Sequence, residues 1–371
     1  MNGRGLLVHE WIERVGGAER VLDEFVALHP GAEVLTLWDD HPERYPDARV
    51  HESRLARTPL RGRKAAALPL MSREWRRCGS ALDLGPYDWA LVSSHLFAHH
   101  VRVPGVDPSR QFTYVHTPAR YLWAAECDER GRSLPVRAVA GLFRAVDRRR
   151  AHDLENVAVN SAFVQERAAR AWGVESTVIH PPVDVERVRR AAGDPDALTD
   201  DERVLLEGLP SDFVLGASRF VPYKRLDVAI SAGAATGRPV VLAGRGPDED
   251  RLRALAAASG ADVHVVVAPS DALLAHLLAR AAVLTFPAIE DFGILPVEAM
   301  AVGTPVVVAD RGGATESVTA LTGVRLQEDD PVALRSAIDA AVRLSPDACR
   351  RRADDFAAEE FRRRVTEWTA V

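Results

Sequence analysis

The sequence predicts two doubly wound α/β domains, each built on a parallel sheet, that face each other across a cleft. Short apolar runs alternate with amphipathic stretches along the chain, from "GLLVHE" and "WALVSS" in the first half to "FVLGAS" and "TPVVVAD" in the second. Runs of this kind are typical of strands buried on both faces, and the stretches between them suit crossover helices. At 371 residues the chain is also long for a single core.

A segment rich in Pro and Asp, residues 181–213, interrupts the strand pattern and indicates a hinge. We therefore expect an N-terminal domain over residues 1–185 and a C-terminal domain over residues 186–350. The tail, residues 351–371, is helical in pattern and is expected to pack back on the N-terminal domain. In doubly wound sheets ligands bind beyond the carboxyl ends of the strands, so the loops that follow strands are the candidates for a site.

Composition excludes several classes of protein. The net charge of −6 is unlike that of a chain that binds nucleic acid over its whole surface. The three cysteines, Cys78, Cys127 and Cys349, have no C-x-x-C spacing, so neither a disulfide framework nor a zinc site is predicted. The start of the chain has too short an apolar run for a signal peptide, and no run reaches the ~18 residues of a membrane span. These features predict a cytoplasmic protein.

Two pairs of acids have the D-x-D spacing of some metal–diphosphate sites. They are Asp194 with Asp196 and Asp248 with Asp250. Their positions near predicted helix starts or in the hinge favour acids that complement helix dipoles. No metal site is therefore predicted.

Lysine is rare in this chain, which otherwise uses arginine. Only Lys64 and Lys224 are lysines among 47 basic residues. Lys224 and Arg219 lie in the predicted loop after the first strand of the second domain, where a compact charge and a bidentate fork suit phosphate oxygens. A solvated loop pair is the alternative. Lys64 lies in the basic stretch "RTPLRGRKAAALPLMSREWRR", for which a solvated surface is favoured over contact with an anionic acceptor or a membrane.

Two further loops in the first half are candidates. Gly16 and Gly17 fall between the first predicted strand and a helix, where backbone amides can approach an anionic group. A tight turn that binds nothing explains the same glycines. His116 directly follows a predicted strand in "YVHTPARYLW", which places it to line a sugar pocket, although a loop histidine with satisfied hydrogen bonds is an equal alternative.

The stretch "EDFGILPVE" places two glutamates, Glu290 and Glu298, around a loop and a helix start. On one continuous helix they would lie about 80° apart, a poor fit to one stripe. Pro296 suits the first helical position, which puts Glu298 near the third position, in the first turn. Glu290 then belongs to the preceding loop. The two acids would surround backbone amides that converge on the helix start, those of Phe292, Gly293, Ile294 and Leu295.

These residues resemble a known family. Glu290 and Glu298 with "FGILPVEAMAVGTPVV" resemble the Glu-seven-Glu motif of retaining glycosyltransferases of family 4, which have the GT-B fold of two Rossmann-like domains. Further matches are "GGAERVL", "NSAFVQERA", "VIHPPVD", "SRFVPYKRLD", "AGRGPDEDRL" and "DRGGATESV", so the resemblance covers nearly the whole chain. "HTPARYLW" is similar to members that transfer mannose or related deoxy sugars, often from GDP-linked donors.

The resemblance implies transfer of a hexosyl group, with retention, from a nucleotide sugar to a hydroxyl of a glycan, a lipid-linked or a natural-product acceptor. No metal or other cofactor is implied. Arg219 and Lys224 would bind the donor diphosphate, which Gly16 and Gly17 would approach from the other domain. His116 would lie by the reacting sugar. Glu298 would bind the nucleotide ribose. Glu290 would bind the donor sugar, together with the amides of Phe292, Gly293, Ile294 and Leu295.

Donor and acceptor identity stay open at this point. A GDP sugar is the leading donor, and a UDP or dTDP sugar is the alternative. The family often has a glycine beside the base, where this chain has Val267 and Ala268. A nucleotide-sugar epimerase, a phosphorylase and a non-catalytic sugar-binding protein are alternatives from other classes. The expected partners exclude nucleic acid and include peripheral contact with the inner membrane face.

Overall fold

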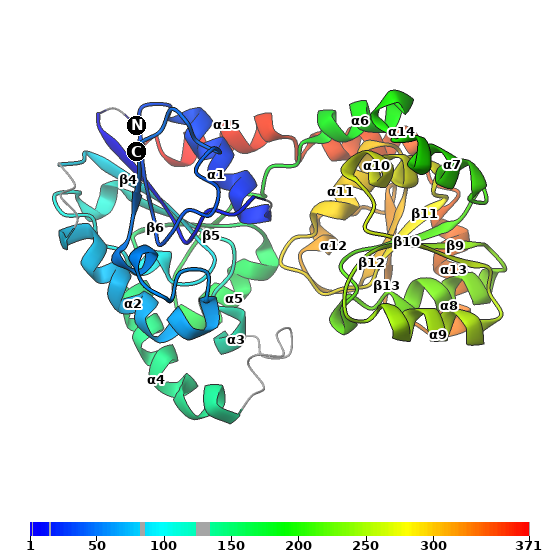
Figure 1. The fold of residues 1–371 in the computed structure, drawn as a ribbon, viewed down its shortest axis with the longest axis horizontal. Helices are drawn as coiled ribbons and strands as arrows, with labels where there is room; N and C mark the ends of the chain where they lie inside the picture. The colour runs from blue at the N-terminus through cyan, green and yellow to red at the C-terminus, as the bar shows by residue number, and fades with distance from the viewer. Residues whose placement is uncertain (2, 15, 82–85, 124–133, 371) are drawn as a thin grey trace. The chain divides into compact units, whose positions relative to one another are not determined.

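The chain divides into two compact units in the computed structural model, which describes residues 1, 3–14, 16–81, 86–123 and 134–370 (Figure 1). The first unit is Met1–Pro182 with Glu359–Val371, and the second is Val183–Ala358. The second unit therefore extends eight residues beyond the expected boundary at 350. The reason is that the helix over Pro346–Asp354 buries Cys349 and Ala353 in the core of the second unit.

The first unit is built on a seven-stranded sheet with the order β3-β2-β1-β4-β5-β6-β7, in which neighbouring strands run parallel. Alternate residues of β1 explain its apolar sequence: Leu6 and Val8 pack into one core cluster and Leu7 into another. The strands are β1 Gly5–His9, β2 Glu33–Thr36, β3 Val50–Glu52, β4 Trp89–Ser94, β5 Gln111–Val115, β6 Asn156–Val159 and β7 Thr177–Val178.

The last helix, α15, belongs to the first unit although it follows the second in the chain. Its Phe361 and Val365 are buried, and the Phe361 ring lies 5.8 Å from the rings of both Phe25 and Tyr114. The segment 359–370 thus completes the core of the first unit. The helices of this unit are α1 Gly17–Leu28, α2 Lys64–Ala81, α3 Arg120–Trp123, α4 Leu134–Ala151, α5 Ala162–Trp172 and α15 Ala358–Trp368, with 3-10 turns η1 Arg54–Arg57, η2 Ala98–His100 and η3 Pro108–Arg110.

The second unit is built on a six-stranded parallel sheet with the order β10-β9-β8-β11-β12-β13. The strands are β8 Val214–Ala217, β9 Val240–Gly244, β10 Val263–Val267, β11 Val283–Phe286, β12 Val306–Ala309 and β13 Gly323–Leu326. The helices are α6 Val185–Gly193, α7 Asp200–Gly208, α8 Asp227–Thr236, α9 Glu249–Ser259, α10 Asp271–Arg280, α11 Ile294–Ala301, α12 Ala314–Ser317, α13 Pro331–Ala341 and α14 Pro346–Asp354, with 3-10 turns η6 Pro195–Ala197 and η7 Pro222–Lys224.

Both sheets reverse their strand order once. The reversal lies between β1 and β4 in the first sheet and between β8 and β11 in the second. At such a switch point the two neighbouring loops leave the sheet in opposite directions, which opens a site beyond the carboxyl ends of the strands. Gly16 and Gly17 follow β1, Arg219 and Lys224 follow β8, and Glu290 follows β11, whereas His116 follows β5, the neighbour of β4. The prediction of two doubly wound parallel sheets is confirmed.

Two smaller findings concern membranes and thiols. None of the helices in the described part of the chain is long and apolar enough to cross a bilayer. Cys78 and Cys349 are buried free thiols, and burial raises the pKa of Cys349 to about 11. Cys127 lies outside the described residues.

Candidate functional site

The second unit brings Lys224 and Glu290 together at the switch point of its sheet. Lys224 ends the 3-10 turn η7, after β8, and Glu290 lies in the loop after β11. The ammonium nitrogen Nζ of Lys224 forms an ion pair with Oε1 of Glu290, and both side chains are mostly buried. The same nitrogen lies 5.8 Å from the centre of the Phe286 ring and 5.4 Å from that of Tyr223. Lys224, which is expected to bind the diphosphate, and Glu290, which is expected to bind the sugar, therefore contact each other directly.

Arg219 lies in the same loop and remains exposed. Its Nη2 donates a hydrogen bond to the hydroxyl of Tyr223, 2.9 Å away. A neighbouring loop braces this one, since the amide of Phe220 donates to the carbonyl of Arg245 and the amide of Asp248 donates to the carbonyl of Phe220. Arg219 and Lys224 thus share Tyr223 as a neighbour. Backbone hydrogen bonds to the loop after β9 fix the loop that carries them.

Helix α11 begins two residues earlier than the sequence predicted. It starts at Ile294, after Gly293 in the left-handed region at φ 96°, so Pro296 is the third helical residue and Glu298 the fifth. Pro is tolerated there because the first four amides of a helix have no intrahelical partner. The first-turn position predicted for Glu298 was wrong. The amides of Phe292, Gly293, Ile294 and Leu295 still fall at the helix start.

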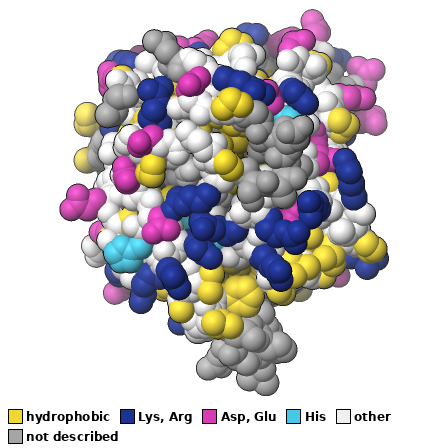
Figure 2. Space-filling view, turned by 90° about the vertical axis from the view of Figure 1, so that its left-hand side faces the viewer, with side chains coloured by type: hydrophobic (Ala, Val, Ile, Leu, Met, Phe, Trp, Pro, Cys, Tyr) yellow, Lys and Arg dark blue, Asp and Glu magenta, His cyan; other side chains and the backbone are white. Residues whose placement is uncertain are grey.

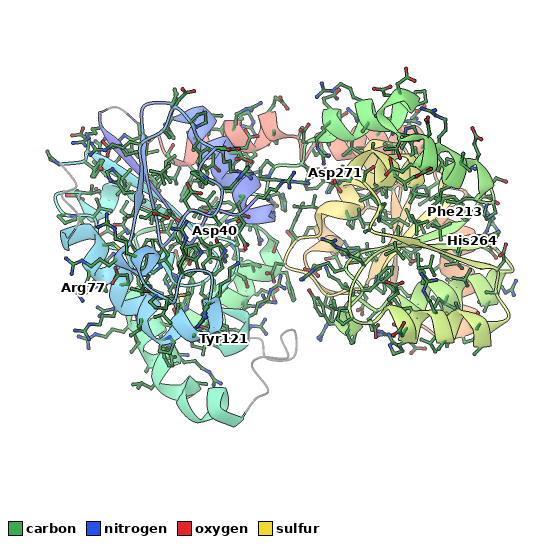
Figure 3. The ribbon with its side chains drawn as sticks, viewed as in Figure 1. Asp40, Arg77, Tyr121, Phe213, His264 and Asp271 are labelled. Atoms are coloured by element: carbon green, nitrogen blue, oxygen red, sulfur yellow. The ribbon has the colours of Figure 1, made fainter. Side chains whose placement is uncertain are left out.

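Glu298 is nearly buried and faces a cation that the sequence did not single out. The carboxylate Oε1 lies 3.5 Å from Nη2 of Arg187, in helix α6. Nη1 of the same arginine donates to Oδ2 of Asp271 at 3.2 Å, and Asp271 opens helix α10 (Figure 3). Arg187 therefore orients two carboxylates. Only the fold reveals it, because the residue stands in no motif.

The glycines of "DRGGATESV" have a role in packing. The amide of Gly313 donates to the carbonyl of Glu290 at 2.8 Å, and a Cβ on Gly313 would lie 1.9 Å from the carbonyl oxygen of Asp291. No larger residue fits against this backbone. The loop after β12 thus fixes the loop that carries Glu290.

The loop after β10 contains a strained residue. Ala268 has φ 51°, in the left-handed region that glycine occupies at little cost. Its amide donates to the carbonyl of Gly244 at 2.8 Å, and the preceding residue, Val267, leaves 46% of its surface exposed. The alanine therefore keeps the conformation of a glycine at the position where the sequence departs from the resembled family.

In the first unit, Gly16 precedes α1 and Gly17 is the first residue of the helix. A Cβ on Gly16 would lie 1.8 Å from Oε2 of Glu19, so the glycine makes room for that buried carboxylate. Burial raises the pKa of Glu19, and hydrogen bonds from the backbone of Glu13 and of Glu19 itself lower it. Gly16 therefore has a structural explanation, and binding of an anion by Gly17 stays a prediction.

Arg44 holds this glycine loop in place and was missed by the sequence analysis. Its Nη1 donates to the carbonyls of Glu13 and Arg14, at 3.2 and 2.9 Å. Nε and Nη2 form a bidentate pair with Asp23 of α1, at 2.8 and 2.6 Å. One guanidinium thereby ties the loop after β1 to the helix that follows it.

His116 is 9% exposed and follows β5, which pairs with β4, one of the two strands at the switch point of the first sheet. Its Nε2 is 2.9 Å from Oγ of Ser93, which is also 3.0 Å from Nδ1 of His9. His95 lies beside this group, with its ring centre 6.2 Å from that of His116. His9 ends β1, Ser93 lies in β4 with His95 just after it, and His116 follows β5, so three neighbouring strands bring these residues together.

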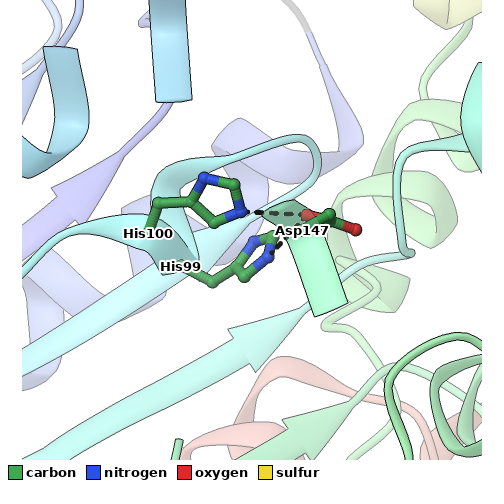
Figure 4. Close-up of side chains that lie close together, drawn as sticks. All are labelled: His99, His100 and Asp147. Carbon is green, nitrogen blue, oxygen red and sulfur yellow. Dashed lines mark hydrogen bonds and ion pairs between the residues drawn. The ribbon is translucent and has the colours of Figure 1, made fainter. Parts of the chain in front are cut away.

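A second histidine cluster is fully buried behind this site. His99, His100 and Asp147 offer ligand atoms within 4.8 Å of one another (Figure 4). Asp147 already accepts four hydrogen bonds, two from the histidine Nε2 atoms at 2.9 and 3.1 Å and two from the indoles of Trp123 and Trp172 at 2.7 Å. Hydroxyls of Ser72 and Ser94 meet the histidine Nδ1 atoms. The cluster is explained as a satisfied polar network.

Comparison with known proteins gives the following. Residues 199–357 match the family model of the glycosyl transferases group 1. A GDP-mannose-dependent alpha-(1-6)-phosphatidylinositol monomannoside mannosyltransferase of Mycolicibacterium smegmatis is 33% identical over 213 residues, 53% of this chain and 55% of that protein. A D-inositol 3-phosphate glycosyltransferase of Acidothermus cellulolyticus is 33% identical over 186 residues, 45% and 38% of the two chains. The chain spans about half the length of such relatives or less.

Solved structures extend the likeness to the whole fold. The structure of Anabaena Alr3699/HepE in complex with UDP-glucose superposes with a TM-score of 0.68 at 18% identity and covers 100% of both chains. Sucrose-phosphate synthase from Thermosynechococcus elongatus gives 0.71 at 18% identity, with 99% and 98% covered. At this identity the comparison concerns the fold, which is that of the GT-B glycosyltransferases.

Proposed function

We propose that this chain, whose residues 199–357 form a domain of the glycosyl transferases group 1 family, transfers a hexosyl group from a nucleotide sugar to an acceptor hydroxyl. The observation that carries the proposal is the ion pair of Lys224 and Glu290 at the switch point between β8 and β11, next to Arg219. A cation and an acid at this edge suit a ligand that is anionic at one end and rich in hydroxyls at the other.

In this proposal the donor exchanges partners with the ion pair. The diphosphate takes Lys224 and Arg219, and the carboxylate of Glu290 is released to accept hydrogen bonds from the sugar hydroxyls. The amides at the start of α11 add donors on the same side. Glu298 accepts from the ribose, and Arg187 orients its carboxylate. The binding of each end of the donor thereby prepares the site for the other end.

Protein groups supply the charge stabilisation in the proposed reaction. Negative charge grows on the leaving diphosphate, and Lys224, Arg219 and helix-start amides are preorganised donors for it. We propose retention by a front-face route, in which the leaving phosphate takes the proton of the acceptor hydroxyl. No metal is assigned a role. A covalent glycosyl adduct on Glu290, trapped by rapid quench and found by peptide mass spectrometry, would contradict this route in favour of double displacement.

GDP-mannose is the leading donor. The mannosyltransferase of Mycolicibacterium smegmatis supports it by its name and by 33% identity. A thermal-shift screen of GDP, UDP and dTDP should give the largest stabilisation with GDP, because a ligand of the native state raises its unfolding temperature. A preference for UDP or dTDP would overturn this donor. Release of GDP with an acceptor supports a transferase, and an epimer from the donor alone would support a nucleotide-sugar epimerase.

We further propose that the first unit contacts an anionic membrane surface through α2 and α4. Residues 54–77 contain eight Arg or Lys and one Glu, within a chain of net charge −6. Burial and the nearby Arg150 and Arg102 lower the pKa of Arg76, so like charges from both helices gather here. Figure 2 shows Lys and Arg beside apolar side chains on one face of the molecule. Leu70 of α2 and Leu142 of α4 are exposed apolar side chains.

Vesicle co-sedimentation tests the membrane contact. The protein should bind vesicles that contain phosphatidylglycerol and release them as salt rises, and it should not bind phosphatidylcholine vesicles. The double substitution Arg73→Glu with Arg77→Glu should abolish binding; both side chains are exposed, and Arg77 projects outward from α2 (Figure 3). Arg343→Glu, an exposed change in the second unit, is the control. Equal loss in the control would contradict the assignment to α2 and α4.

A further inference from the structure

Three side chains form a hydrogen-bonded row at the carboxyl ends of β1, β4 and β5. Nδ1 of His9 lies 3.0 Å from Oγ of Ser93, and the same oxygen lies 2.9 Å from Nε2 of His116. His9 and Ser93 have no exposed surface. Water therefore does not compete for these bonds, and each proton in the row must be placed on one of these atoms.

The serine hydroxyl has one proton, which couples the tautomers of the two histidines. If Ser93 donates to His116, the hydroxyl accepts from His9, and His9 carries its proton on Nδ1. If Ser93 donates to His9 instead, His116 must carry its proton on Nε2. The state of the buried histidine thus decides the state of the one at the site.

Two observations on His9 decide between these states. Its Nε2 is buried and has no hydrogen-bond partner among the described residues, so a proton there would be a buried donor without an acceptor. Burial lowers the pKa of His9 well below 6.5, so the ring is neutral and carries one proton. The proton of His9 is therefore on Nδ1.

We infer that His9 and Ser93 are positioning residues that fix His116 as the tautomer with its proton on Nδ1. The row then runs from Nδ1–H of His9 to Oγ of Ser93, and from Oγ–H of Ser93 to Nε2 of His116. Any group that meets Nδ1 of His116 must accept a hydrogen bond. Taken together with the proposed function, on which this step rests, His116 donates a hydrogen bond to an oxygen of the substrate that it meets. It does not deprotonate the acceptor hydroxyl.

Nitrogen NMR tests the tautomers without any activity. Protein labelled with ¹⁵N-histidine should give two-bond ¹H–¹⁵N patterns of the Nδ1–H form for His9 and His116, each assigned by its substitution to Gln. In Ser93→Ala, His116 should show a mixture of the two tautomers instead of the Nδ1–H form alone. Ser94→Ala removes the neighbouring serine, which meets His99, and should leave both patterns unchanged. An Nε2–H form or a cation at His116 in the native protein would overturn the inference.

Kinetics test the role in the reaction separately. Ser93→Ala should lower kcat about tenfold, the value of one hydrogen bond of about 1.4 kcal/mol, with the KM of the donor unchanged. An unchanged kcat alongside a lost tautomer pattern would overturn the role of the row in positioning. If no nucleotide sugar supports turnover in the native protein, the proposed function fails, and the NMR result still decides the tautomers.

Discussion

Lys224 pairs with Glu290, a residue 66 positions further along the chain. The pairing follows from the sheet, because β8 and β11 are parallel neighbours and their following loops meet at one edge. The pairing also suggests why this position has a lysine, one of two in the chain, and not an arginine. An arginine fork would hold a carboxylate through two bonds, whereas an ammonium can exchange a carboxylate for a phosphate with little rearrangement.

Replacement of that lysine should affect catalysis more than folding. Lys224→Ala is expected to lower kcat by ~10²–10³, the usual cost of losing one preorganised charge-stabilising group. Steady-state kinetics and thermal unfolding measure the two effects. Lys64→Ala is a matched control, since Lys64 also pairs with a glutamate, Glu13, at 2.7 Å, but in the first unit. The affinity of the Lys64→Ala variant for nucleotide should equal that of the native protein. Near-normal turnover of Lys224→Ala would refute the assignment of Lys224 to the diphosphate.

Glu298 should control the affinity for the nucleotide through its ribose. Glu298→Ala should weaken binding about tenfold or more, since a hydrogen bond to a charged group contributes ~1.5–3 kcal/mol. Calorimetry with GDP and with its 2′- and 3′-deoxy analogues checks this. The native protein should discriminate against at least one analogue and the variant should not. Equal discrimination by both proteins would place the ribose elsewhere. Arg187→Ala should give a smaller loss in the same direction.

The buried carboxylate of Asp147 should be a large contributor to stability. Asp147→Ala leaves the two imidazoles and two indoles without their common acceptor, and we expect the free energy of unfolding to fall by ~3–5 kcal/mol. Urea unfolding measures it, with the exposed Asp153→Ala as the control. Treatment with EDTA should leave the native unfolding curve in place. A shift on chelation would instead identify His99, His100 and Asp147 as metal ligands.

Stability should fall in mild acid because of His100. Burial and the nearby His99 lower the pKa of His100 to about 4, against 6.5 in the unfolded chain. Between these values the unfolded state binds the proton and the native state does not, so stability decreases as pH falls from about 6.5 to about 4. The contribution is about 3 kcal/mol. Urea unfolding at pH 7.5, 6.5, 5.5 and 4.5 should show a shallower pH dependence in His100→Gln, and an identical dependence would contradict the prediction.

The sequence was sufficient for the architecture, and it located the two loops in which Lys224 and Glu290 meet. Runs buried on both faces predict parallel strands directly, and Lys224, Glu290 and Glu298 stand in recognisable segments. Arg187, Arg44 and Ser93 were missed because each contacts residues distant in the sequence that only the folded chain brings near. The start of α11 was misplaced because Pro296 was taken as the first helical residue. Gly293, which turns the chain in the left-handed region, was the better indicator.

The path of α15 has a consequence for biosynthesis. The second unit is a continuous segment inserted between two parts of the first, so all of its strands have been synthesised before α15 emerges from the ribosome. The first unit lacks Phe361 and Val365 until then, and the face formed by Phe25 and Tyr114 stays uncovered. The unit that begins first in the chain is therefore the one that finishes folding last.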